Sequence, residues 1–184
     1  MRNDELSLTA WPSDMKISVD DGYTPLLELL FIRHLMSDDP HEKLPKISPE
    51  PGGSIEQFEL EDNQWREAWE NQINWLTHKS GPPPPQFTAQ FGFSGFDIDA
   101  FHIWRDAIRA ENLTVISEAP ETLNMGALVK AWKVGLDTVM VLPFEEPYIK
   151  YLNRTSMIVS GVTRGTPKLY TSALEDFFVA ANRN

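Results

Sequence analysis

The stretch of sequence that decides the fold class is TVMVL at residues 138–142, followed shortly by SMIVSGV at residues 156–162. Both stretches are short, rich in β-branched residues and without charged side chains, which is typical of strands buried on both faces. Two shorter stretches, KISV at residues 16–19 and LTVI at residues 113–116, also have the composition of strands. We therefore predict a sheet of four or five strands.

Helical patterns separate these stretches. The clearest is the stripe formed by Trp65, Trp69, Ile73 and Leu76, whose spacing follows the helical period. Such patterns predict helices over residues 26–36, 62–79, 98–110 and 125–134, and a last helix from about residue 172. Residues 87–96 fit either a strand or a packed aromatic loop. Because helices and strands do not alternate strictly, we predict an α+β fold, with a mixed sheet of about four or five strands packed against four or five helices in an irregular topology.

The length of 184 residues suits a single globular domain over residues 1–184. Within it, GPPPP at residues 81–85 must be extended, because consecutive prolines cannot continue a helix. This run is the best candidate for an internal division. It would separate an acidic helical part, residues 1–80, from an α/β part, residues 86–184.

The charge of the chain is concentrated in one region. The formal net charge is −11, and residues 37–70 alone contain 10 acidic and 3 basic side chains. Such a region repels nucleic-acid phosphates and attracts basic proteins, although a charge run often serves only solubility. We therefore expect no nucleic-acid partner. The candidates for an acidic face that binds a basic protein are Asp38, Asp39, Glu59, Glu61 and Asp62.

Several classes of function are disfavoured by what the sequence lacks. It contains no cysteine, which excludes disulfides, thiolate catalysis and cysteine-bound zinc. It has no phosphate-binding loop or dinucleotide fingerprint, so no cofactor is expected. No apolar run approaches the roughly 20 residues of a spanning helix, and the first residues lack a secretory pattern. We expect no membrane partner and a cytoplasmic location.

One group of residues has the spacing of a small catalytic site. Asp99, His102 and Asp106 lie at positions i, i+3 and i+7, so one face of a helix would present all three. An imidazole between carboxylates can act as an oriented general base or as a metal ligand. The alternative is a solvated helix face with local ion pairs to Arg105 or Arg109. Because no second histidine lies at ligand spacing nearby, no metal site is assigned.

Trp75 lies off the apolar stripe of its helix and close to the proline run. It either packs under the prolines or is exposed, and an exposed tryptophan beside an acidic face can anchor an interface. The favoured function is therefore a non-catalytic protein-interaction module, an adaptor or an immunity-like inhibitor with a basic protein partner. Two alternatives stay open. One is a small metal-dependent or hydrolytic enzyme that uses Asp99, His102 and Asp106, and the other is a homodimer that associates through Trp75 or the helix over residues 26–36.

Overall fold

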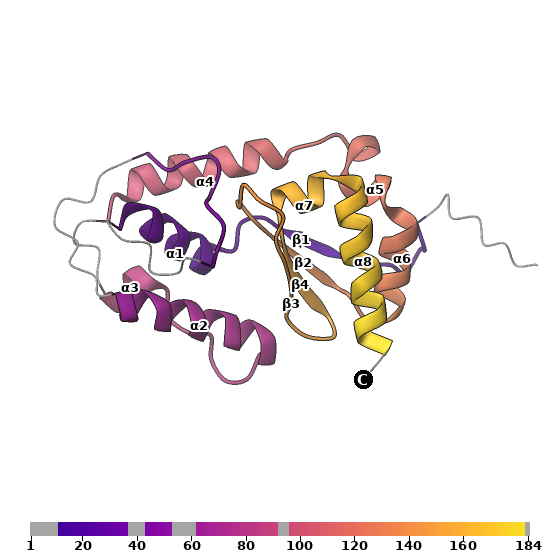
Figure 1. The fold of residues 1–184 in the computed structure, drawn as a ribbon, viewed down its shortest axis with the longest axis horizontal. Helices are drawn as coiled ribbons and strands as arrows, with labels where there is room; N and C mark the ends of the chain where they lie inside the picture. Colours follow the sequence, from indigo (N-terminus) through magenta and orange to yellow (C-terminus); the bar gives the residue numbers. More distant parts are fainter. Residues whose placement is uncertain (1–10, 37–42, 53–61, 92–95, 183–184) are drawn as a thin grey trace, which may run out of the picture.

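A computed structural model describes residues 11–36, 43–52, 62–91 and 96–182 (Figure 1). In this part of the chain a four-stranded sheet has helices on both of its faces. The α-helices are α1 (Thr24–Leu35), α2 (Asp62–His78), α3 (Phe87–Phe91), α4 (Ile98–Asn112), α5 (Pro120–Leu123), α6 (Met125–Lys133), α7 (Gly161–Gly165) and α8 (Pro167–Asn182). One 3-10 turn, η1, spans Ile116–Glu118.

The sheet has the strand order β1-β2-β4-β3. Its strands are β1 (Ser18–Asp20), β2 (Thr138–Leu142), β3 (Ile149–Tyr151) and β4 (Ser156–Ser160). Strands β1, β2 and β4 run parallel, and β3 is antiparallel to β4. The two strands that decide the fold class are therefore confirmed as the central pair, β2 and β4. Both are apolar on both sides because helices cover both faces of the sheet.

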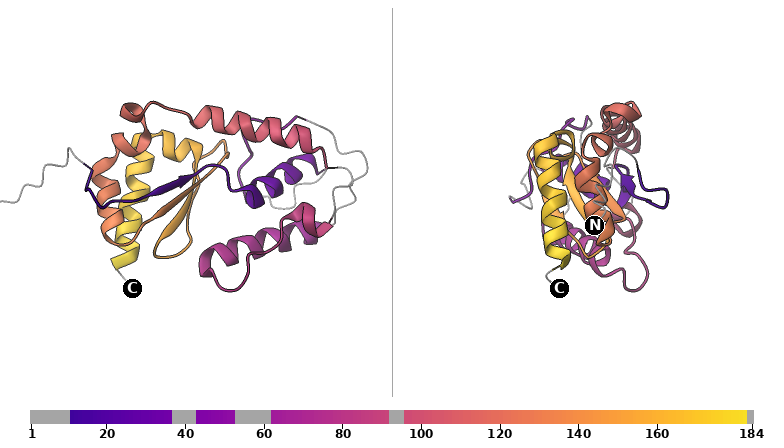
Figure 2. Two further views of the ribbon diagram at one scale, coloured as in Figure 1. Left: turned by 180° about the vertical axis from the view of Figure 1, so that it is seen from behind. Right: turned by 90° about the vertical axis from the view of Figure 1, so that its right-hand side faces the viewer.

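Alternate residues of the central strands point into two separate cores, as the two-residue repeat of a strand requires. Met140 and Ile158 belong to a core shared with α1, α2 and α4, on one side of the sheet in Figure 1. Val139 and Val159 belong to a second core shared with α6 and α8, on the other side. Figure 2 shows the same separation from behind.

The predicted α+β class with a mixed sheet is confirmed. The described residues contain eight α-helices instead of four or five, since α3, α5 and α7 are helices of only four or five residues. Residues 113–116 were predicted to be a strand, but they lead from α4 into η1. Residues 87–91 are helical, and the last helix begins at Pro167, where the missing N–H of proline is tolerated.

The proline run at residues 81–85 lies between α2 and α3, both of which pack against α1. The chain turns after α2 through two residues with positive φ, Lys79 at 47° and Gly81 at 79°. This left-handed conformation favours glycine at the second position and carries the chain back toward α1. Trp65 and Phe101, from opposite sides of the run, share the first core. The single-domain assignment and the division at residues 81–85 stay predictions.

Candidate functional site

The three candidate catalytic residues lie on α4, and the side chains of Asp99, His102 and Asp106 are all exposed. The ring of His102 packs beside that of Phe101, with their centroids 5.7 Å apart. The Asp106 carboxylate lies 3.6 Å from the Arg105 guanidinium, which is the local ion pair of a solvated helix face. Across the described ranges, no group of three His, Asp or Glu residues could hold a metal ion. A catalytic role for these residues stays a prediction.

The acidic binding candidates fall on parts of the chain outside the description. Asp38, Asp39, Glu59 and Glu61 lie outside the described residues. Asp62 begins α2, and its side chain is also outside the description. An acidic face built from these five residues stays a prediction.

Two charged side chains interrupt the apolar helix α1, and both are buried. The Arg33 guanidinium donates hydrogen bonds to the carbonyl oxygens of Leu44 and Pro45, each at 2.7 Å. The Glu28 carboxylate accepts from the Thr88 hydroxyl, which lies 3.2 Å from Oε1 and 3.3 Å from Oε2. Helix α1 therefore uses its two buried charges to hold segments that are distant along the chain.

Glu28 also caps α3 from another helix. Burial raises the pKa of Glu28 above its ordinary value of 4.5, although hydrogen bonds from Thr88 and from the backbone N–H of Phe87 favour the charged form. The first N–H groups of a helix have no partner within it, so a carboxylate at this position satisfies them. The presence of Glu28 among the apolar residues of α1 was the sequence signal for this contact.

Replacing Glu28 by Gln is expected to change how stability depends on pH. Because the pKa of Glu28 is raised in the folded state, its contribution to stability is complete below pH 4.5 and is lost as the pH rises through the folded-state pKa. Glutamine cannot lose this proton. As the pH rises from about 4 to about 7, the unfolding free energy of Glu28→Gln should therefore increase relative to that of the unsubstituted chain. Urea denaturation measures both values. The exposed Glu70→Gln is the control, and a flat or reversed difference for Glu28→Gln would contradict the prediction.

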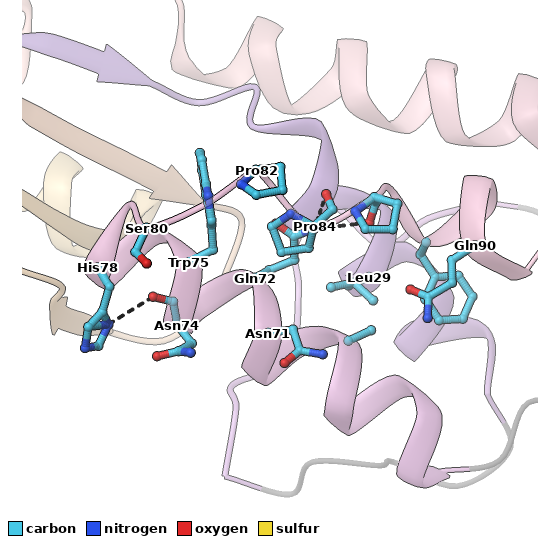
Figure 3. Close-up of a pocket in the computed structure, with 13 residues that line it drawn as sticks. Leu29, Asn71, Gln72, Asn74, Trp75, His78, Ser80, Pro82, Pro84 and Gln90 are labelled. Carbon is cyan, nitrogen blue, oxygen red and sulfur yellow. Dashed lines mark hydrogen bonds between the residues drawn. The ribbon is translucent and has the colours of Figure 1, made fainter.

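A groove of about 780 Å³ lies between α2, the proline run and α3 (Figure 3). Trp75, Pro82 and Pro84 form its apolar wall, and side chains that include Asn71 and Asn74 of α2 supply polar groups. We call this cavity the Trp75 groove. Of the residues proposed from the sequence for binding, it contains Trp75.

Trp75 lies beside the prolines and is half-buried. Its indole Nε1–H donates to the carbonyl oxygen of Gly81 at 3.2 Å. The neighbouring Gln72 Nε2 lies 3.4 Å from the carbonyl oxygens of both Pro84 and Pro85. Side chains of α2 thus hold the proline run against the helix.

A second surface feature joins α4 to α5. Residues 113–123, which we call the apolar segment, run along the outer edge of the molecule in Figure 1. The exposed fractions of four aliphatic side chains in it are 79% for Leu113, 62% for Val115, 84% for Ile116 and 61% for Leu123. Sequence reasoning missed this surface because it assigned the first part of the segment to a strand, where such residues would be buried.

An ordered frame holds the apolar segment. The Arg164 guanidinium donates two hydrogen bonds to the Glu121 carboxylate, at 2.8 and 2.7 Å, and the Tyr170 hydroxyl donates to the same carboxylate at 3.2 Å. Burial alone lowers the pKa of Arg164, but the hydrogen bonds and charge of Glu121 raise it. Within the segment, the Thr122 hydroxyl donates to the carbonyl oxygen of Ile116 at 2.7 Å.

Comparisons of the chain with protein-family models, with curated proteins and with solved structures find no match. Within the part that the structure describes, no helix combines the length and the apolar character needed to cross a membrane.

Proposed function

We propose that this chain is a non-catalytic protein-interaction module and that the apolar segment is its docking surface. The supporting observation is that Leu113, Val115, Ile116 and Leu123 are each more than 60% exposed within one short segment. A single exposed aliphatic side chain is ordinary on a protein surface, whereas a group of them marks a surface that binds something.

The charges around the segment indicate the chemistry of the partner. Asp106, Glu111 and Glu118 are exposed in or just before it, against one exposed cation, Arg109. The chain as a whole carries a net charge of −11. A partner helix with an apolar stripe and flanking lysines or arginines would match both the aliphatic side chains and the carboxylates. We therefore propose that a basic protein partner binds at the apolar segment.

The frame beneath the segment supports the same proposal. The paired Glu121 and Arg164 side chains are only 13% and 11% exposed, so they fix the base of α5. Because the backbone of α5 is already held in place, less conformational entropy is lost there when a partner binds. A basic partner suits an adaptor, or an inhibitor that neutralises a basic protein. The proposal also includes a cytoplasmic location.

Replacing Ile116 by Asp is expected to weaken binding of a basic amphipathic peptide by about tenfold or more, because Ile116 is the most exposed of the four side chains. The probe is a fluorescein-labelled helical peptide of leucine and lysine, with a matched peptide of leucine and glutamate. Fluorescence anisotropy of the full chain measures both affinities. Binding of the lysine peptide should also weaken as salt is added.

Val179→Asp on α8 is the matched control, because Val179 is an exposed aliphatic residue outside the segment. Both substitutions add one negative charge, so a purely electrostatic attraction would not be weakened by either. Equal effects of the two substitutions, or equal binding of the two peptides, would contradict the proposal.

Self-association is the competing explanation for an exposed apolar segment. The helix α1, expected as one possible dimer contact, has most of its aliphatic residues buried within the chain, including Leu26 and Leu30 at 0% exposure. Light scattering should therefore give a mass near 21.0 kDa. A mass near twice this value that falls to one chain in Ile116→Asp would show that a second copy covers the segment, and would overturn the proposed partner.

A further inference from the structure

We propose that the Trp75 groove binds an uncharged saccharide unit. Its apolar wall is formed by Trp75, Pro82 and Pro84, and polar side chains lie along α2 and at α3 (Figure 3). A pyranose ring has the complementary character, with C–H groups on its faces and hydroxyl groups around its edge. The volume of about 780 Å³ falls within the range of about 300–1,000 Å³ that is usual for small-molecule sites.

The lining of the groove is electrically neutral. Among the described residues that form it there is no Asp, Glu, Lys or Arg. This is unusual in a chain with a net charge of −11. A charged ligand would lose hydration without gaining a counter-charge, so the groove favours an uncharged ligand.

The polar side chains suit hydroxyl groups. Asn71, Asn74 and Gln90 are exposed at the groove, and each amide has an acceptor oxygen and two N–H donors. A sugar hydroxyl both donates and accepts, so it can pair with either end of an amide. Gln72 is buried, and its amide lies 3.4 Å from the carbonyl oxygens of Pro84 and Pro85 and 3.4 Å from the hydroxyl of Tyr23. Ordinary N–H···O bonds are about 2.9–3.0 Å, so a bound hydroxyl would improve on them.

The apolar wall is held in position before any ligand arrives. The bond from the indole N–H of Trp75 to the carbonyl oxygen of Gly81 fixes the edge of the ring, which lines the groove. The left-handed turn at Lys79 and Gly81 directs the prolines back along α2. Asn153 holds the end of α2 from the sheet, since its Nδ2 donates to the carbonyl oxygen of Leu76 at 3.1 Å. Such preorganisation lowers the entropic cost of binding.

The test is a titration of the full ¹⁵N-labelled chain with cellobiose, maltose and diacetylchitobiose, followed by two-dimensional NMR. At least one of these neutral sugars should shift the indole N–H signal of Trp75 and the side-chain amides of Asn71 and Gln90 in a saturable way. Added salt should leave the affinity unchanged, in contrast to the lysine peptide. Glucosamine and glucuronate, which carry opposite charges, should bind more weakly than the neutral sugars.

Two variants with matched controls assign the site. Trp75→Ala should weaken binding by about tenfold, the loss typical of a stacking aromatic anchor. Asn71→Ala should also weaken binding, and because Asn71 is exposed this variant keeps the fold even if Trp75→Ala unfolds. Trp11→Ala and Asn63→Ala, at exposed residues outside the groove, should leave binding unchanged.

The saccharide site and the docking surface can fail separately. Ile116→Asp should leave sugar binding intact, and Asn71→Ala should leave the affinity for the lysine peptide intact. Absence of saturable shifts with all three neutral sugars would overturn the saccharide proposal. An effect of Asn63→Ala equal to that of Asn71→Ala would overturn it as well.

Discussion

Trp65→Ala is expected to lower the free energy of unfolding by about 3–5 kcal/mol, as large-to-small substitutions of buried aromatic residues do. Trp65 has 0% exposure in the first core. Its ring stacks on that of Trp69 with centroids 5.5 Å apart and an interplanar angle of 10°. Its Nε1–H donates to the carbonyl oxygen of Leu29 at 2.7 Å, so the substitution leaves both a cavity and a buried acceptor without this donor. Urea denaturation followed by circular dichroism measures the loss.

Two control variants separate the causes of this loss. Trp65→Phe keeps most of the ring but removes the indole donor, so it should cost clearly less than Trp65→Ala. Trp11→Ala, at a tryptophan that is 42% exposed, should change stability by only about 0.5 kcal/mol. If Trp65→Ala costs no more than Trp11→Ala, α2 does not pack on α1 as described.

Glu121→Ala is expected to lower the unfolding free energy by about 3 kcal/mol, because it leaves the guanidinium of Arg164 largely buried without its paired carboxylate. The Tyr170 hydroxyl also loses its acceptor. Burial and the Glu121 carboxylate raise the pKa of Tyr170, which keeps this hydroxyl protonated as a donor. The substitution therefore removes the Glu121 hydrogen bonds that join α5 to α7 and to α8.

A surface ion pair provides the control for Glu121→Ala. Lys130 and Glu175 lie 3.9 Å apart with side chains more than half exposed, so Glu175→Ala should cost about 0–1 kcal/mol. A double-mutant cycle with Arg164→Met isolates the coupling between Glu121 and Arg164. Equal losses for Glu121→Ala and Glu175→Ala would show that the frame beneath the apolar segment is not held by this pair.

Sequence patterns by themselves determined the centre of the fold. Strands β2 and β4 were predicted from short apolar runs, because a strand covered on both faces needs apolar residues at every position. Helix α2 was predicted from the helical period of the stripe that contains Trp65 and Trp69, and both side chains are buried. Trp75 was singled out because it lies off that stripe, and it does line the groove. These features depend on residues that are close together in the sequence, so the spacing of the apolar residues reveals them.

Only the tertiary structure decided the features that depend on distant neighbours. Helix α3 forms where Glu28, 60 residues away along the chain from Thr88, meets its first N–H groups. The apolar segment is exposed because no described element covers Ile116, although its composition resembles that of a buried strand. Strands β2 and β4 could be predicted without knowledge of such contacts, because their apolar runs are visible in the sequence. An apolar pattern shows which side chains can be buried, whereas the packing of the other elements decides which of them are.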